Sequence, residues 1–99
     1  MTQESDRSLQ RLHARIEGRV QGVGFRYFVL KEAQTLGLTG WVANRIDGQV
    51  EVVAEGEHEA LEKLLAVLHE GPRGALVMDV HYEWGDASGE FDHFGVDHY

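Results

Sequence analysis

The chain has 99 residues, of which 42% are hydrophobic, and it carries a formal net charge of −8. This length is typical of one domain with its own buried core, and the absence of cysteine excludes disulfides, thiolate zinc sites and a cysteine nucleophile. The acidic balance argues against nucleic acid and anionic membranes as partners, because both require an extended basic surface.

The first nine residues, MTQESDRSL, are polar and include acidic side chains, unlike a signal or transit peptide. No apolar run approaches the roughly 20 residues that a membrane-spanning helix needs. We therefore expect residues 1–9 to form a loose polar arm and residues 10–99 to form the single domain. We also expect a cytoplasmic monomer.

The first predicted elements are a strand and a helix. From Leu12 to Val20 apolar and polar residues alternate, as in a strand with one buried face. After a glycine-rich segment, apolar residues recur at helical spacing, and Gly37 is suited to a left-handed helix end. These helical apolar residues are Phe25, Phe28, Val29, Ala33 and Leu36.

A hairpin and a second helix follow. The strand-like runs LTGWVAN and QVEVVAE flank Asp47-Gly48, a strong hairpin turn signal. The segment 57–70 carries leucines at the i, i+3, i+4, i+7 spacing of an amphipathic helix, which Gly71-Pro72 ends. These leucines are Leu61, Leu64, Leu65 and Leu68.

Residues 76–84 alternate again and predict a fourth strand, and FDHFGV (91–96) predicts a short fifth. The order is β-α-β-β-α-β with a short C-terminal fifth strand. This order predicts an α+β ferredoxin-like sandwich, an antiparallel sheet covered by two helices on one face. We expect Trp41 and Trp84 to lie in its core. Because the fold hosts many functions, function must be argued from the site.

The segment GRVQGVGFR (18–26) combines glycines with an arginine. It lacks the lysine and hydroxyl of a Walker A loop, and Tyr27 occupies the position of the third glycine in a dinucleotide fingerprint. Gly22 and Gly24 allow successive N–H groups to point into one concavity, next to the positive end of the following helix. Arg26 adds a planar guanidinium that can bind phosphate through two hydrogen bonds.

Spacing alone leaves two interpretations open for the glycine-rich segment and two for Asn44. The glycine-rich segment suits a small tetrahedral dianion, but it equally suits an ordinary connection with a surface arginine. Asn44 ends a predicted strand just before the hairpin turn. An asparagine there most often bonds its own backbone, and the alternative is a functional amide.

The sequence resembles the acylphosphatase family. The resemblance runs from GRVQGVGFR through LGLTGWVANRIDGQVEVVAEG and GPRGALVMDV to the terminal FGVDHY, and its first two blocks are highly specific. It implies the ferredoxin-like fold. It also implies hydrolysis of the carboxyl-phosphate bond of small acyl phosphates, giving a carboxylate and inorganic phosphate, without a metal or cofactor.

The resemblance also implies the site. The family's phosphate-binding arginine matches Arg26, and its water-orienting asparagine matches Asn44, so these two are the expected catalytic residues. Backbone amides of the loop would hold the phosphoryl oxygens, those of Gln21, Gly22, Val23, Gly24, Phe25 and Arg26. One departure is Ala43, where members often carry a basic residue, and its effect on the substrate is open. The polar arm is also longer than a minimal member needs.

The six histidines suggest a metal site, above all the pairs Asp92-His93 and Asp97-His98. Adjacent strand residues point to opposite faces, so a solvated edge is favoured, although adventitious metal binding stays open. We expect His13 and His81 to be surface groups.

Three non-catalytic alternatives use the same fold. An RNA-recognition module needs stacking aromatics and a basic sheet face, and a metal chaperone needs a Cys-x-x-Cys pair. An accessory domain of a larger carbamoyl-transfer protein is a closer alternative. The length of the chain, with no further domain, favours the free-standing enzyme.

Overall fold

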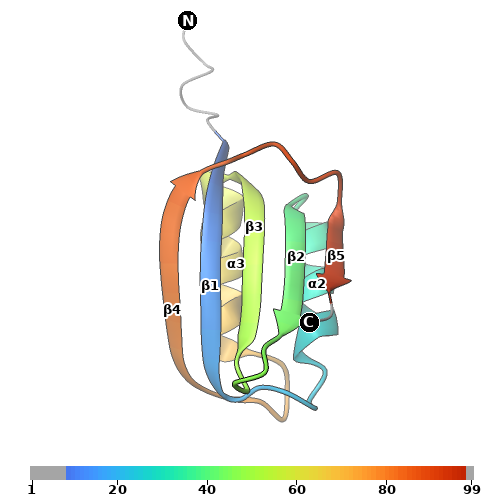
Figure 1. The fold of residues 1–99 in the computed structure, drawn as a ribbon, viewed down its shortest axis with the longest axis vertical. Coiled ribbons are helices and arrows are strands. Elements are labelled where there is room, and N and C mark those ends of the chain that lie inside the picture. Colours follow the sequence, from blue (N-terminus) through green and yellow to red (C-terminus); the bar gives the residue numbers. More distant parts are fainter. Residues whose placement is uncertain (1–8, 98–99) are drawn as a thin grey trace, which may run out of the picture.

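Five strands and two helices make up residues 9–97, the part of the chain that the structure describes. The elements of this computed structural model are β1 (Leu9–Arg19), α2 (Phe25–Thr35), β2 (Thr39–Asn44), β3 (Val50–Glu57), α3 (His58–Glu70), β4 (Leu76–Asp86) and β5 (Phe94–Asp97). Both helices pack on the same face of the sheet (Figure 1). The predicted ferredoxin-like order with a short fifth strand is confirmed.

The sheet has the strand order β4-β1-β3-β2-β5. The first four strands pair antiparallel, but β5 pairs with β2 in parallel, so the sheet is mixed rather than wholly antiparallel. The cause is the connection 87–93, which crosses one end of the sheet from the β4 edge to the β5 edge (Figure 1). Because β4 runs antiparallel to β2, a chain that crosses and turns back enters β5 in the direction of β2.

The first strand begins a few residues earlier than the alternating pattern predicts. β1 begins at Leu9, the last residue of the predicted arm, and its pairing with β3 starts at Leu9 and Glu57. The rest of that arm, residues 1–8, lies outside the described residues, as does His98 of the second Asp/His pair.

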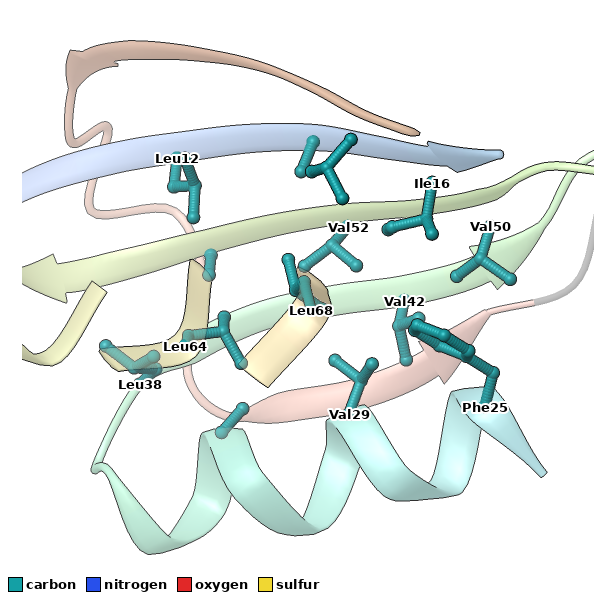
Figure 2. Close-up of a cluster of buried hydrophobic side chains, with 14 of the residues drawn as sticks. Leu12, Ile16, Phe25, Val29, Leu38, Val42, Val50, Val52, Leu64 and Leu68 are labelled. Atoms are coloured by element: carbon teal, nitrogen blue, oxygen red, sulfur yellow. The ribbon is translucent and has the colours of Figure 1, made fainter. Parts of the chain in front are cut away.

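The core lies between the sheet and the two helices (Figure 2). Alternating residues of β1 point into it, and α2 and α3 contribute one apolar face each, as predicted. Burying each such aliphatic or aromatic side chain contributes roughly 1.5–3 kcal/mol. Its largest fully buried members are Leu12, Ile16, Val20, Phe25, Val29, Val42, Val50, Val52, Leu61, Leu64 and Leu68.

Neither tryptophan lies in this core, contrary to the prediction. Trp84 is 37% exposed, because β4 is an edge strand, and its ring lies 4.7 Å from the His58 ring between centroids. Trp41 is partly buried and precedes Val42, which points toward the helices, so Trp41 lies on the opposite face.

Candidate active site

Two segments far apart in the sequence meet at one end of the sheet. The β1–α2 connection, residues 20–24, and the β2–β3 hairpin both lie at the end opposite the 87–93 crossing (Figure 1). They meet because β1 and β2 each run antiparallel to β3, which lies between them. The two strands therefore finish at the same end of the sheet. The last strand residues there are Arg19 and Asn44.

The β1–α2 connection has the backbone shape that its glycines predict. Gly22 and Gly24 have φ angles of 76° and 79°, in the left-handed region that favours glycine. A Cβ at either position would meet nothing within 4 Å, so backbone conformation rather than space requires glycine here. Gly24 is the N-cap of α2, and its carbonyl accepts a hydrogen bond from Phe28 N at 3.0 Å.

The N-terminus of α2 is suited to an anion. Its N-cap makes no side-chain hydrogen bond, and its first turn contains no acidic residue. The first N–H groups of a helix have no partner within the helix and carry its positive partial charge. An anion placed there would therefore satisfy donors that no side chain of the cap satisfies.

A cavity of about 250 Å³ brings Arg26 and Asn44 together. Its lining residues come from the connection, from the first turn of α2 and from the end of β2. They are Val20, Gly22, Gly24, Phe25, Arg26, Tyr27 and Asn44. Of the predicted backbone donors, Gln21 and Val23 belong to the connection but are not among the lining residues.

Tyr27 is a lining residue that sequence reasoning missed. It is exposed, although it follows the buried Phe25 closely on α2. The available signal was an aromatic residue directly after Arg26, on the polar side of the predicted helix.

The Asn44 side chain donates and accepts no hydrogen bond within residues 9–97, whereas the turn interpretation requires one. The turn itself is closed by its backbone, with Arg45 N donating to Gln49 O at 2.8 Å and Gly48 N donating to Arg45 O at 3.2 Å. Asp47 Oδ1 accepts from Gln49 N at 3.0 Å. The predicted Asp47-Gly48 hairpin is confirmed, and Asn44 lies just outside it.

The residues on either side of Asn44 direct their side chains elsewhere. Ala43 is buried and pairs with Glu51 in the sheet. Adjacent strand residues point to opposite faces, so a basic residue at this position would lie on the face away from Asn44. The Arg45 guanidinium donates to Asp47 and Glu51, each at 3.0 Å.

These contacts change the pKa values of the hairpin. Hydrogen bonds to Asp47 and then to Glu51 raise the pKa of Arg45. The backbone hydrogen bond from Gln49, followed by the contact with Arg45, lowers the pKa of Asp47. Arg45 is thus held by carboxylates of its own hairpin. Among the described residues that line the cavity, Arg26 alone carries a charge.

No histidine within residues 9–97 is among the residues that line this cavity. His13 Nε2 is 2.6 Å from Glu51 Oε2, and His81 Nε2 is 2.6 Å from Glu17 Oε2, on the sheet face opposite the helices. Both histidines are surface groups, as predicted. Within residues 9–97, no three His, Asp or Glu side chains are grouped so that they could hold a metal ion.

The first Asp/His pair is not on a strand, because β5 begins only at Phe94. Asp92 and His93 are instead exposed residues of the crossing connection. The expectation that they face opposite sides of a strand therefore does not apply to them.

A family model described as Acylphosphatase matches residues 12–96. The chain belongs to the acylphosphatase family. An acylphosphatase of Salinibacter ruber is 52% identical over 87 residues, which cover 88% of this chain and 92% of the relative. The chain is therefore a hydrolase, and its family supports acyl phosphate hydrolysis, with an acyl phosphate as substrate and phosphate as product.

Solved structures agree with this assignment. An acylphosphatase from Coxiella burnetii is 41% identical with a TM-score of 0.86, and the match covers 98% of this chain and all (100%) of that one. Full-length HypF, in a phosphate- and nucleotide-bound form, is 28% identical with a TM-score of 0.84, over 92% of this chain but only 12% of HypF. Neither helix among the described residues has the length and hydropathy to span a bilayer.

Proposed function

We propose that the cavity shared by Arg26 and Asn44 is the active site, and that it hydrolyses small acyl phosphates without a metal or cofactor. The observation that carries this proposal is the meeting of three features in one cavity of about 250 Å³: the N-terminus of α2, a guanidinium and an amide at a strand end. Ligand cavities commonly measure about 300–1,000 Å³, so this one suits a phosphate with a small acyl group.

The β1–α2 connection would hold the phosphoryl group. Backbone amides of residues 21–26, arranged by Gly22 and Gly24, would donate to its oxygens, and Arg26 would bind two of them side by side. Charge on the phosphoryl oxygens in the transition state would meet donors that are already in place. Such preorganised groups account for much of the catalysis of phosphoryl transfer.

Asn44 would place the attacking water. Its amide oxygen would accept a hydrogen bond from the water and align the water oxygen with the phosphorus, opposite the acyl oxygen. The new P–O bond forms as the bond from phosphorus to the acyl oxygen breaks, and that electron pair leaves with the carboxylate. Asparagine is not a base at neutral pH, so the water's proton would pass to a phosphate oxygen of the substrate.

The same residues define which substrates should react. Among the described residues that line the cavity, no side chain is a carboxylic acid or a histidine that could protonate a leaving group. A carboxylate needs no proton to leave, whereas the alkoxide of a simple phosphate ester does. Acyl phosphates should therefore be good substrates, and phosphate monoesters should be poor ones.

We propose that the protein acts as a monomer, as predicted from the sequence. Light scattering after size exclusion should give a mass near the chain mass of 11.1 kDa. A stable dimer whose dissociation abolishes activity would contradict this part of the proposal.

Phosphate release from benzoyl phosphate, measured with and without a chelator, tests the function. We expect equal turnover in both conditions and little release from phenyl phosphate, the matched monoester. Loss of activity with chelator and recovery with a divalent ion would overturn the metal-free mechanism. Comparable turnover of benzoyl and phenyl phosphate would overturn the argument from the leaving group.

A further inference from the structure

The side chain of Gln21 connects the two halves of the proposed site. Its Nε2 donates to the carbonyl of Arg45 at 2.8 Å and to the carbonyl of Gln49 at 2.9 Å. Both partners are acceptors, so the nitrogen of the Gln21 amide must face them, and both of its N–H groups are used. These bonds join positions 24 and 28 residues apart in the sequence.

The two carbonyls lie at the two ends of the turn that follows Asn44. Arg45 is the next residue after Asn44, and its own N–H donates to the same Gln49 carbonyl, at 2.8 Å. One amide group therefore holds both ends of the hairpin turn against the β1–α2 connection. A further side-chain bond from the hairpin, from Gln49 Nε2 to Glu17 Oε2 in β1, is 3.4 Å long and correspondingly weak.

We infer that Gln21 is a positioning residue, which sets the place of the Asn44 amide relative to the bound phosphoryl group. This inference rests on the proposed function, in which the connection holds the phosphate and Asn44 holds the water. In-line attack depends on the distance and angle between these two, and a misplacement of about 1 Å can cost on the order of 10²-fold in rate. The side chain of Gln21 would thus fix the distance between the two parts of the site without itself touching the reacting atoms.

The side chains closest to glutamine in size or chemistry do not reproduce this connection. Asparagine is one methylene shorter, glutamate at neutral pH has no donor, and methionine has similar length but no N–H group. Gln21→Met therefore removes both hydrogen bonds while it keeps the approximate shape. Gln49→Met is the matched control, because it changes the same residue type on the hairpin while the Gln49 carbonyl still accepts from Gln21.

The experiment measures kcat on benzoyl phosphate and the inhibition constant of inorganic phosphate for Gln21→Met, Asn44→Ala and the double variant. We expect Gln21→Met to lower kcat about tenfold or more, with phosphate inhibition within about twofold of the parent. In the Asn44→Ala background the same change should lower kcat by less than about twofold, because the group it positions is gone. Gln49→Met should keep the parent kcat.

A merely structural role of Gln21 would give a different result. It would lower the melting temperature and leave kcat per folded molecule unchanged, or it would lower kcat by the same factor with and without Asn44. Either outcome overturns the inference. If Gln21→Met does not fold, Gln21→Asn keeps an uncharged amide at this partly exposed position but is one methylene shorter, and the same comparison applies.

The outcomes also separate this inference from the proposed function. Full kcat in Gln21→Met beside an impaired Asn44→Ala would overturn the positioning role alone. Full kcat in Asn44→Ala would overturn the role of Asn44 in the proposed function, and the inference with it.

Discussion

The two ends of the sheet each combine backbone N–H groups with an arginine. At the end crossed by residues 87–93, the carboxylate of Glu55 accepts hydrogen bonds from the backbone N–H groups of Ser88 and Gly89, at 2.9 and 3.0 Å. The Ser88 hydroxyl and the Arg11 guanidinium also donate to it, at 2.9 and 2.8 Å. At the other end, backbone N–H groups and Arg26 surround a cavity that contains no carboxylate of the described chain.

The difference lies in where the anion comes from. Glu55 is 4% exposed, and its own carboxylate fills the donors at the crossed end permanently. Burial raises the pKa of Glu55, but the hydrogen bonds from Ser88, Gly89 and Arg11 outweigh it and lower the pKa to about 2. Glu55 thus fixes the crossed end in the folded protein, whereas we propose that the anion at the cavity end is the phosphoryl group of a substrate. Changes at the cavity should affect catalysis, and changes at Glu55 should affect stability.

The largest effect is expected for Arg26→Lys. A compact ammonium cannot reproduce the two parallel hydrogen bonds of a guanidinium, so kcat/KM should fall by about 10³-fold although the charge is kept. Competitive inhibition by inorganic phosphate should weaken in parallel. Arg73→Lys, at an exposed arginine, is the control and should match the parent. A variant at position 26 with near-parent activity and unchanged phosphate inhibition would place the anion site elsewhere.

Asn44→Ala should lower kcat by roughly 10²–10³-fold and leave phosphate inhibition nearly unchanged, because in the proposed function the amide orients water and does not bind phosphate. The fold should survive, since loss of one polar side chain at a strand end typically costs about 1 kcal/mol. Steady-state kinetics and thermal melting on the same preparation check both parts. Unchanged turnover with a lowered melting temperature would make Asn44 a turn residue.

Glu55→Gln should have the opposite effect: it should lower stability and leave turnover unchanged. The substituted amide group has one acceptor oxygen, so some donors at the crossed end lose their partner at a cost of about 1–3 kcal/mol in the free energy of unfolding. Turnover per folded molecule should equal that of the parent. Urea unfolding and kcat measure the two quantities. A loss of kcat with unchanged stability would show that the two ends of the sheet are not separate in function.

The smallest expected effect is the loss at low pH of the stability that Glu55 contributes. Because the pKa of Glu55 is lower in the folded protein than its ordinary value of 4.5, the charged carboxylate stabilises the fold above that value. This contribution should be lost as the pH falls from about 5 towards 2, through the folded pKa. Unfolding at several pH values should show the stability gap between parent and Glu55→Gln closing over this range. A gap that is constant from pH 7 to about 2 would contradict the role of the charge.

Local patterns in the sequence were enough to predict most of the elements. The alternation around Leu12 and Ile16 identified a strand and its buried face, and the leucines of α3 identified a helix and its buried side. Asp47-Gly48 marked the hairpin, because a tight turn requires residues that accept unusual backbone angles. The resemblance to acylphosphatases then singled out Arg26 and Asn44, which spacing alone left open.

Only the tertiary structure decided which of these elements meet. The pairing of β1 and β2 on either side of β3 brings Arg26 and Asn44 to one cavity and places Gln21 within hydrogen-bond reach of the hairpin. The same strand order makes β4 an edge, which exposes Trp84, and makes β5 parallel to β2. Sequence periodicity reports local backbone geometry and the apolar side of an element, whereas these contacts arise from pairing between strands distant in the sequence.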